Sequence, residues 1–135
     1  MRLLIDANVL LDVLQQREPH FESSSLIWKL CETEQEEGYI SALTFANLVY
    51  VMRKELESEK IAEILQKLAL VFRIADLTST ELSTAAEMKW DDFEAAVQSA
   101  AAERIHADYI ITRNVRDFKK SKVIAFMPSE YLARR

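Results

Sequence analysis

The chain has 135 residues, of which half are apolar and 29% are charged, a globular composition that suits one domain spanning residues 1–135. Its net charge of −5 excludes a general nucleic-acid coat protein, which would be basic overall. The single cysteine excludes an internal disulfide, no apolar run reaches the roughly 20 residues of a membrane span, and no signal peptide is visible, so a cytoplasmic protein without membrane contact is expected.

The N-terminal third predicts two strands separated by two helices. Residues 3–5 form a short apolar run, which is typical of a strand buried on both faces. From residue 9 to residue 14 the apolar positions recur at helical spacing, and a second helix carries apolar residues over positions 26–31, including Cys31 as a core residue. Gly38 is a natural helix stop, and residues 39–42 resemble a second strand.

The middle of the chain continues the alternation of helices and strands. Thr44 is expected to cap a helix, and residues 61–68 carry the stripe of an amphipathic helix. Residues 71–74 predict a third strand, after which Thr78 and Glu81 have the spacing of a capping box.

The C-terminal third predicts one further helix and two strands. Asp92 can cap an alanine-rich helix, and residues 108–112 and 123–126 complete a set of about five strands. Strands that alternate with helices indicate an α/β sandwich with a mostly parallel sheet.

Oxygen-bearing side chains follow three of these strands, where parallel sheets bind their ligands. They are Asp6 after the first strand, Ser41, Thr44 and Asn47 after the second, and Thr112, Asn114 and Asp117 after the fourth. Oxygen ligands suit Mg²⁺ or Mn²⁺, and Mg²⁺ typically takes only one or two carboxylates. The same residue types are also common helix caps and turn formers, so a purely structural role is the alternative for each of them.

A basic strip follows Asn114 along the chain. Its cations are Arg113, Arg116, Lys119, Lys120 and Lys122. Such a strip either grips a nucleic-acid backbone or is a solvated face. The chain has no Gly-rich phosphate loop, nucleophile elbow or zinc-protease motif that would support another chemistry.

Several segments together resemble the PIN domain, and most closely the bacterial VapC-type toxins of that family. These segments are "LLIDANVLLDVL", "ISALTFANLVYVMRKEL", "DFEAAVQSAAAERIHADYIITRNVRDF" and "MPSEYL". The resemblance implies a three-layer α/β/α sandwich with about five mostly parallel strands. It also implies a Mg²⁺- or Mn²⁺-dependent ribonuclease that acts on RNA, forms a homodimer and is neutralised by a small antitoxin protein.

The resemblance assigns candidate site residues one by one. Asp6 matches the first acid of the family motif, Glu94 matches the first acid of a "DFED" segment, and Asn114 and Asp117 match the "TRN..DF" element. Asn47 falls where many relatives have glutamate. These five residues form the expected catalytic set, with Asp6, Glu94 and Asp117 holding the metal ion. Outside the cut, Arg113, Arg116, Lys119 and Lys120 are expected to bind the RNA backbone.

Ala95 departs from the family pattern, which has a metal-ligating aspartate at this position. A methyl group cannot ligate a cation, so the departure is expected to weaken metal binding, whether the exchange is natural or introduced. Two functions therefore stand side by side for this chain. One is metal-assisted hydrolysis of RNA, and the other is a catalytically silent PIN-fold module that binds RNA or a protein partner.

Overall fold

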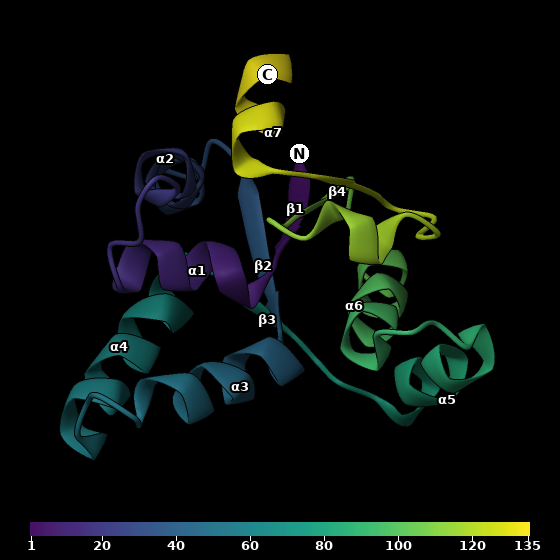
Figure 1. Cartoon of the computed structure of the whole chain (residues 1–135), viewed down its shortest axis with the longest axis horizontal. Helices are drawn as coiled ribbons and strands as arrows, with labels where there is room; N and C mark the ends of the chain where they lie inside the picture. The colour runs from purple at the N-terminus through teal and green to yellow at the C-terminus, as the bar shows by residue number, and fades with distance from the viewer.

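Five strands form one parallel sheet in the computed structural model, which describes residues 1–135 (Figure 1). The strand order is β3-β2-β1-β4-β5, and every neighbouring pair is parallel. This order puts β1 at the centre, with Leu4 opposite both Tyr39 of β2 and Ile110 of β4. The strands are β1 (Arg2–Ile5), β2 (Glu37–Ser41), β3 (Arg73–Ala75), β4 (Tyr109–Ile111) and β5 (Ile124–Phe126).

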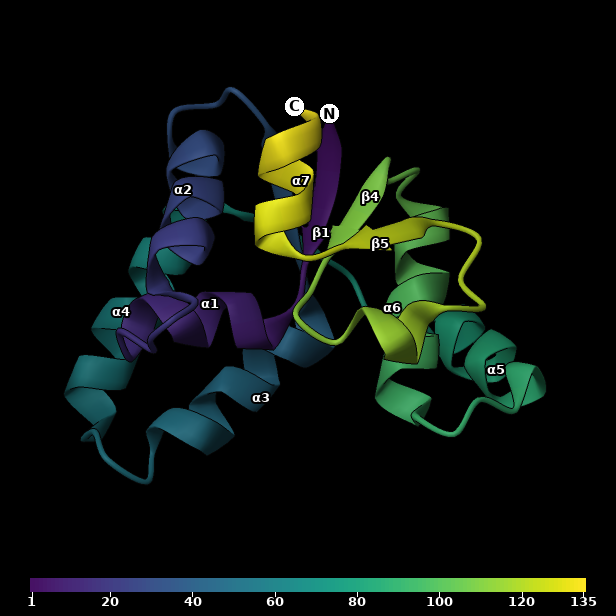
Figure 2. The same cartoon turned by 45° about the horizontal axis from the view of Figure 1, so that its top comes forward.

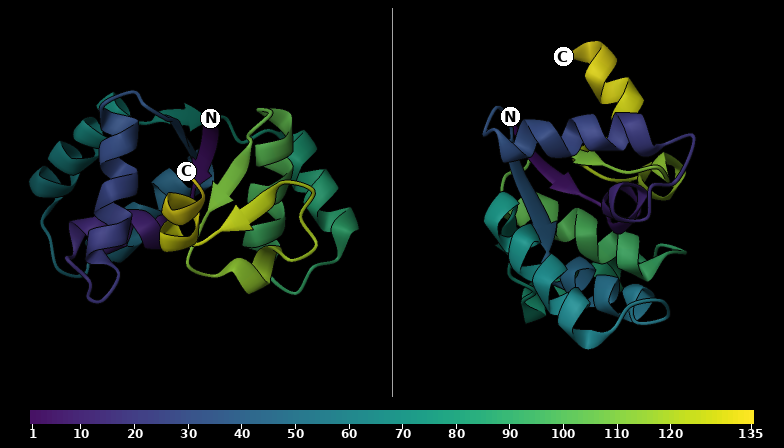
Figure 3. Two further views of the ribbon diagram at one scale, coloured as in Figure 1. Left: turned by 90° about the horizontal axis from the view of Figure 1, so that it is seen from above. Right: turned by 90° about the vertical axis from the view of Figure 1, so that its left-hand side faces the viewer.

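Helices cover both faces of this sheet. The segments that follow β1 and β2 lie on one side together with the C-terminal helix, and the two helices that follow β3 lie on the other (Figure 2; Figure 3, left). The first group is α1 (Ala7–Leu14), α2 (Phe21–Glu32), α3 (Ala42–Met52), α4 (Ser58–Val71) and α7 (Pro128–Arg134). The second group is α5 (Ser79–Met88) and α6 (Phe93–Arg104), and a short 3₁₀ helix, η1 (Val115–Phe118), follows β4.

Alternating residues of the central strand fill two separate cores. Leu3 and Ile5 belong to the larger cluster, which is built with α1, α2, α3, α4 and α7. Leu4 points to the other face, where it packs with Ile110 and with Ala95 and Ala102 of α6. Because successive strand residues face opposite sides of a sheet, both cores need the continuous apolar run of β1. The predicted α/β/α sandwich with a parallel five-stranded sheet is confirmed.

The helix caps agree with the sequence in three places and differ in one. The Asp92 side chain accepts a hydrogen bond from the Ala95 amide, and Thr78 and Glu81 form a capping box. Asp6 caps α1 by accepting from the Ala7 amide. The predicted cap at Thr44 is wrong, because Ser41 already accepts from the amides at the start of α3 and the helix begins before Thr44 is reached.

The prediction that Gly38 stops a helix is also wrong, since Gly38 lies inside β2. α2 ends at Glu32, and its C-cap is Thr33. A Cβ atom at position 38 would lie only 2.6 Å from the Sγ atom of Cys31, so the glycine is needed for the close approach of β2 to α2. Cys31 itself is buried in the core, as predicted.

The strand bounds shift by one or two residues from the predicted ones, most clearly at β3. Val71 is still helical and ends α4, so the third strand covers Arg73–Ala75. No helix of the structure has both the length and the apolar character required to cross a lipid bilayer.

Candidate active site

The sheet has its switch point between β1 and β4, because the strand order runs outward from there in both directions. Asp6 directly follows β1, and Thr112 directly follows β4. At the same end of the sheet, β1 leads into α1 and β2 leads into α3 (Figure 2). Ligands of open α/β sheets bind outside the carboxyl ends of the strands at such a point, so a binding site is expected at this end of the sheet.

Asp6 is a buried acid whose hydrogen-bond partners are all neutral. Only 8% of the residue is exposed. Its Oδ1 atom accepts from the Ala7 amide at 2.7 Å and from the Nε2 atom of Gln98 at 3.1 Å. Its Oδ2 atom accepts from the Thr112 hydroxyl at 2.8 Å and from the Asn8 amide group at 3.4 Å. No lysine or arginine forms an ion pair with it, so these four donors hold the carboxylate in place without balancing its charge.

Asp6 forms part of the wall of a pocket of about 270 Å³, and most of the charged residues in this wall are acidic. Three further carboxylates line this acidic pocket, and they belong to Asp92, Glu94 and Asp117. Asn114 adds another oxygen-bearing side chain, and the only basic residue in the wall is Arg17. The structure thus brings together four of the five expected catalytic residues, which come from the ends of β1 and β4 and from the start of α6.

The carboxyl group of Glu94 has a raised pKa. Partial burial raises the pKa of its carboxyl group above the ordinary value, and repulsion from Asp6 and Asp92 raises it further. A hydrogen-bonding interaction with Asn47 acts in the opposite direction but is outweighed. Asn47, the fifth expected residue, lies on α3 and does not line the acidic pocket itself, but it interacts with Glu94, which does.

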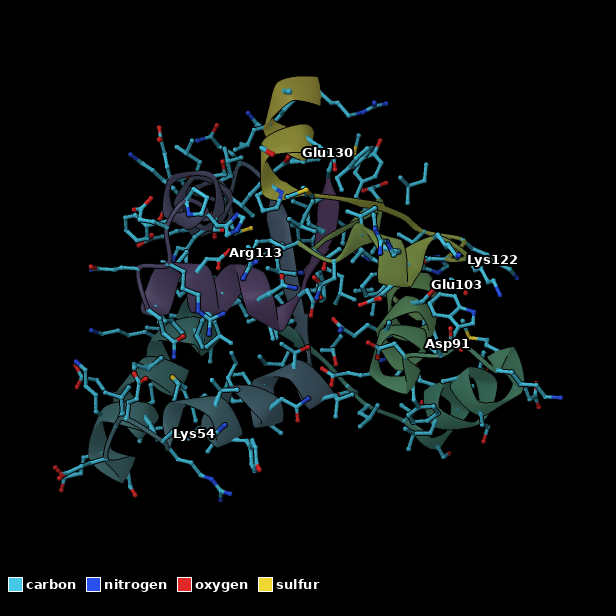
Figure 4. The ribbon with its side chains drawn as sticks, viewed as in Figure 1. Lys54, Asp91, Glu103, Arg113, Lys122 and Glu130 are labelled. Carbon is cyan, nitrogen blue, oxygen red and sulfur yellow. The ribbon has the colours of Figure 1, made fainter.

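Arg113 has a different setting from the rest of the basic strip. It lies beside α1 (Figure 4), and its Nε atom donates to the Oδ2 atom of the fully buried Asp12 at 2.8 Å. The Ser24 hydroxyl donates to the same oxygen, while the Oδ1 atom of Asp12 has no partner. The Arg113 side chain is therefore held by an internal acid through its Nε atom, and its contact with RNA stays a prediction.

The other three residues of the strip that were expected to bind RNA lie together. Arg116, Lys119 and Lys120 line a second pocket, which shares Asp92 and Asp117 with the acidic one. The expected nucleic-acid cations thus lie next to the expected metal residues.

Sequence reasoning missed several residues of the site. Gln98 lies four positions after Glu94 on α6, and this spacing places both on one helix face, so it was a usable signal. Asp92 was anticipated only as a helix cap, although it also lines both pockets. Arg17 follows α1 in a loop, and nothing in its local sequence indicates that it reaches the pocket.

The donor set of the acidic pocket suits a divalent cation that prefers oxygen ligands. Asp6 supplies an unbalanced buried charge, and the mutual repulsion that acts on Glu94 would be relieved by a cation. No three acidic, histidine or cysteine side chains converge closely enough to form a ready-made metal cluster. The arrangement therefore fits an ion such as Mg²⁺, which typically binds through one or two carboxylates and keeps several of its waters.

Ala95 lies in the wall of the same pocket. It is 3% exposed and packs in the smaller core, and its backbone amide donates to Asp92. A longer acidic side chain at this position would enter a pocket that already holds four carboxylates.

Comparison with protein-family models matches residues 2–116 to the PIN domain. No curated protein matches the chain at a significant level.

Several solved structures share the fold at low sequence identity. FitAcB from Neisseria gonorrhoeae is 20% identical, with a TM-score of 0.73 over 94% of this chain and 98% of its own. A toxin–antitoxin complex from Klebsiella pneumoniae is 19% identical, with a TM-score of 0.68 over 93% of this chain and 97% of its own. The sarcin-ricin loop cleaving toxin VapC20 from Mycobacterium tuberculosis is 13% identical, with a TM-score of 0.65 over 80% of this chain and 86% of its own.

Proposed function

This chain belongs to the PIN domain family, and from that premise we propose that it is a Mg²⁺- or Mn²⁺-dependent endoribonuclease that acts as the toxin of a toxin–antitoxin pair. One PIN domain then spans residues 1–135. The observation that carries the proposal is the charge of Asp6, a buried carboxylate that faces three other acids and has only neutral hydrogen-bond partners.

The proposed metal residues are Asp6, Glu94 and Asp117, which line one pocket. A bound divalent cation would neutralise charge on the scissile phosphate and lower the pKa of a water molecule. Asp6 is the fixed member of this set, because the donors from Ala7, Gln98 and Thr112 leave its carboxylate little freedom to turn. Asp117 is exposed on η1 and can adjust to the ion.

The chain's own residues then divide the remaining work of hydrolysis. Water attacks the phosphorus atom, the bond to the leaving ribose oxygen breaks, and that oxygen takes up a proton from solvent. Glu94 lines the same pocket and accepts the proton of the attacking water through a carboxylate oxygen that does not hold the ion. Asn114 lies at the pocket wall and orients the phosphate, while Arg116, Lys119 and Lys120 bind the RNA backbone beyond it.

A small antitoxin and a second copy of the chain complete the proposal as protein partners. One relative in fold is a toxin–antitoxin complex. The outer surfaces of α3 and α4 expose Tyr50 and Leu70, which are 58% and 87% accessible, and apolar side chains of this kind suit a protein interface. Light scattering of the purified chain tests the homodimer directly.

Ala95 favours a second candidate function, a catalytically silent PIN module that binds RNA or a protein without cutting. Its methyl group occupies the pocket wall where the family pattern has an acid. RNA cleavage separates the two functions when it is measured with Mn²⁺ in the wild-type chain, in Asp6→Asn and in Ala95→Asp. Cleavage by the wild type that disappears in Asp6→Asn supports the nuclease. Cleavage by neither the wild type nor Ala95→Asp supports the silent module.

A further inference from the structure

A second pocket of about 230 Å³ adjoins the acidic one and has a different character. We call it the basic pocket, and it is lined by the segment that joins α5 to α6 and by the residues around η1. Figure 4 shows Asp91 of this segment between the two helices. Four cations line the basic pocket, namely Lys89, Arg116, Lys119 and Lys120. Three carboxylates face them, those of Asp91, Asp92 and Asp117, and the remaining lining residue is Trp90.

None of the four cations is held by an internal partner. Every ion pair of the structure lies elsewhere, as the pairing of Arg113 with Asp12 and of Lys122 with Glu103 illustrates. The four cations of the basic pocket are therefore available to an external anion. Free cations gathered beside a phosphodiester-cleaving site suit the phosphate groups of its substrate.

Lys89 occupies a backbone conformation that favours glycine or asparagine. It is the C-cap of α5, with φ of 56° and ψ of 39°, in the left-handed region. A glycine here would relieve the backbone but remove a cation from the basic pocket. The chain nevertheless has a lysine at this position, and its side chain lines the basic pocket.

Trp90 gives the basic pocket its one apolar surface. Part of the side chain packs against the smaller core and against the cluster of α5 and α6, and the remainder lines the pocket. An aromatic side chain within a basic groove is the usual arrangement for unpaired nucleic acid, because bases stack on the ring while cations hold the backbone.

We propose that the basic pocket is a subsite for one unpaired RNA nucleotide adjacent to the cut, with its base against Trp90 and its phosphate on Lys89 and the η1 cations. This inference rests on the proposed ribonuclease function and adds to it a base contact with Trp90 and a phosphate contact with Lys89. The basic pocket, at about 230 Å³, leaves room for no more than one nucleotide. A base-paired nucleotide cannot present its base to Trp90, so duplex RNA is a poor ligand.

The two shared residues place the acidic pocket and the basic pocket next to each other along the RNA strand. Asp92 and Asp117 line both pockets, so a strand that places a phosphate in the acidic pocket has its neighbouring nucleotide in the basic one. The carboxylates repel that nucleotide's phosphate and direct it toward the lysines. The base then turns to Trp90.

Fluorescence anisotropy with a labelled single-stranded ribo-oligonucleotide in EDTA measures this subsite without cleavage. The expected loss of affinity in Trp90→Leu is at least about fivefold, and Trp90→Phe restores most of it because a phenyl ring still stacks. Lys89→Gly weakens binding and reduces the slope of log affinity against log salt by about 0.7, the value of one lost phosphate contact on a single strand. Since glycine suits the backbone at position 89, this loss cannot be attributed to unfolding.

Two matched variants control for backbone and charge. Glu34→Gly also replaces a left-handed residue outside both pockets, and Lys67→Gln removes a surface lysine of α4. Both should bind RNA as the wild type does. Single-strand binding that is absent in the wild type, or unchanged in Lys89→Gly and Trp90→Leu, would overturn the subsite. If RNA binding depends on Lys89 and Trp90 but the chain does not cleave RNA with Mn²⁺, the subsite is supported and the nuclease function is contradicted.

Discussion

Asp6 and Glu36 are buried acids at opposite ends of the same parallel sheet, and their partners differ in charge. Glu36 precedes β2 and is 5% exposed, and it accepts hydrogen bonds from the Met1 ammonium group, the Arg135 guanidinium group and the Tyr131 hydroxyl. The chain termini meet at that end (Figure 2). Asp6 follows β1, is 8% exposed, and accepts only from neutral donors.

The difference indicates at which end of the sheet the protein itself balances the charge of the buried carboxylate. Burying a carboxylate is unfavourable unless cations and hydrogen bonds compensate, and the protein supplies both to Glu36. It supplies only the hydrogen bonds to Asp6. The proposed divalent cation would supply the missing positive charge at the Asp6 end, where three more acids line the pocket.

The largest expected effect is on catalysis and comes from Asp6→Asn. The substitution removes the charge that holds the metal ion but keeps a side chain that can cap α1. RNA cleavage in Mn²⁺ should fall by about 100-fold or more, which corresponds to about 2.7 kcal/mol of transition-state stabilisation. Glu36→Gln is the matched control from the other end of the sheet and should cleave at the wild-type rate under conditions where it is folded. An equal loss of RNA cleavage in both variants would contradict the claim that only the Asp6 end of the sheet is the active site.

The next largest effect is on stability and comes from Glu36→Gln. Removing this carboxylate leaves the Met1 ammonium group and Arg135 without their acceptor, so the free energy of unfolding should fall by about 2 kcal/mol. Urea denaturation in EDTA measures it. Asp6→Asn should change the free energy of unfolding by less than about 1 kcal/mol in the same experiment, since it removes an uncompensated charge. A larger loss in Asp6→Asn than in Glu36→Gln would show that Asp6 is a structural residue.

A smaller effect is expected from Ala95→Asp. Adding a fifth acid to the pocket should strengthen Mn²⁺ binding by about tenfold, or about 1.4 kcal/mol. It should also destabilise the metal-free protein, because position 95 is buried among like charges. Thermal unfolding with and without Mn²⁺ measures both effects, and they should have opposite signs. A variant that is less stable in both conditions, with no gain in metal affinity, would show that position 95 is only a core position.

The smallest effect is the pH dependence of stability, where Glu36 and Glu94 should act in opposite directions. Burial alone would raise the pKa of Glu36, but hydrogen bonds from Tyr131, Met1 and Arg135 outweigh burial and hold it below the ordinary value of 4.5. Its contribution to stability is therefore present above the unfolded pKa and is lost as the pH falls through the folded one.

Burial and the neighbouring acids raise the pKa of Glu94, so the folded protein binds this proton more tightly than the unfolded chain does. Stability should fall as the pH rises from the unfolded pKa of Glu94 to the folded one. The fall should be less than about 1 kcal/mol, because the burial of Glu94 is only partial and solvent screens much of its charge. Urea denaturation across the acidic range in EDTA should show that Glu36→Gln removes the loss at low pH and that Glu94→Gln removes the loss at higher pH. The same slope in both variants would contradict the opposite shifts.

The sequence allowed the alternation of strands and helices to be predicted because the central strands β1 and β4 are apolar runs and helices such as α4 carry an apolar stripe. The error at Gly38 has a tertiary cause. The glycine permits β2 to approach Cys31 and Phe72, and those contacts are not visible in the local pattern, which resembles a helix stop.

The residues of the acidic pocket that lie at strand ends or at the start of a helix could be predicted from the sequence. Asp6, Asn114 and Asp117 follow strands that neighbour each other, and Glu94 lies in the first turn of α6. The pairing of Arg113 with Asp12 was not predictable, since it depends on how α1 lies against the segment after β4. The contrast between Asp6 and Glu36 also requires the structure, because the sequence shows two acids beside strands but not their partners.

Calorimetric titration of Mn²⁺ into the metal-free chain tests the central claim most directly, with the Asp6→Asn and Glu36→Gln variants alongside. A site completed by an external cation predicts that the wild type and Glu36→Gln bind the ion alike and that Asp6→Asn binds it at least about tenfold more weakly. Equal binding by the wild type and Asp6→Asn, or no binding by the wild type, would contradict it.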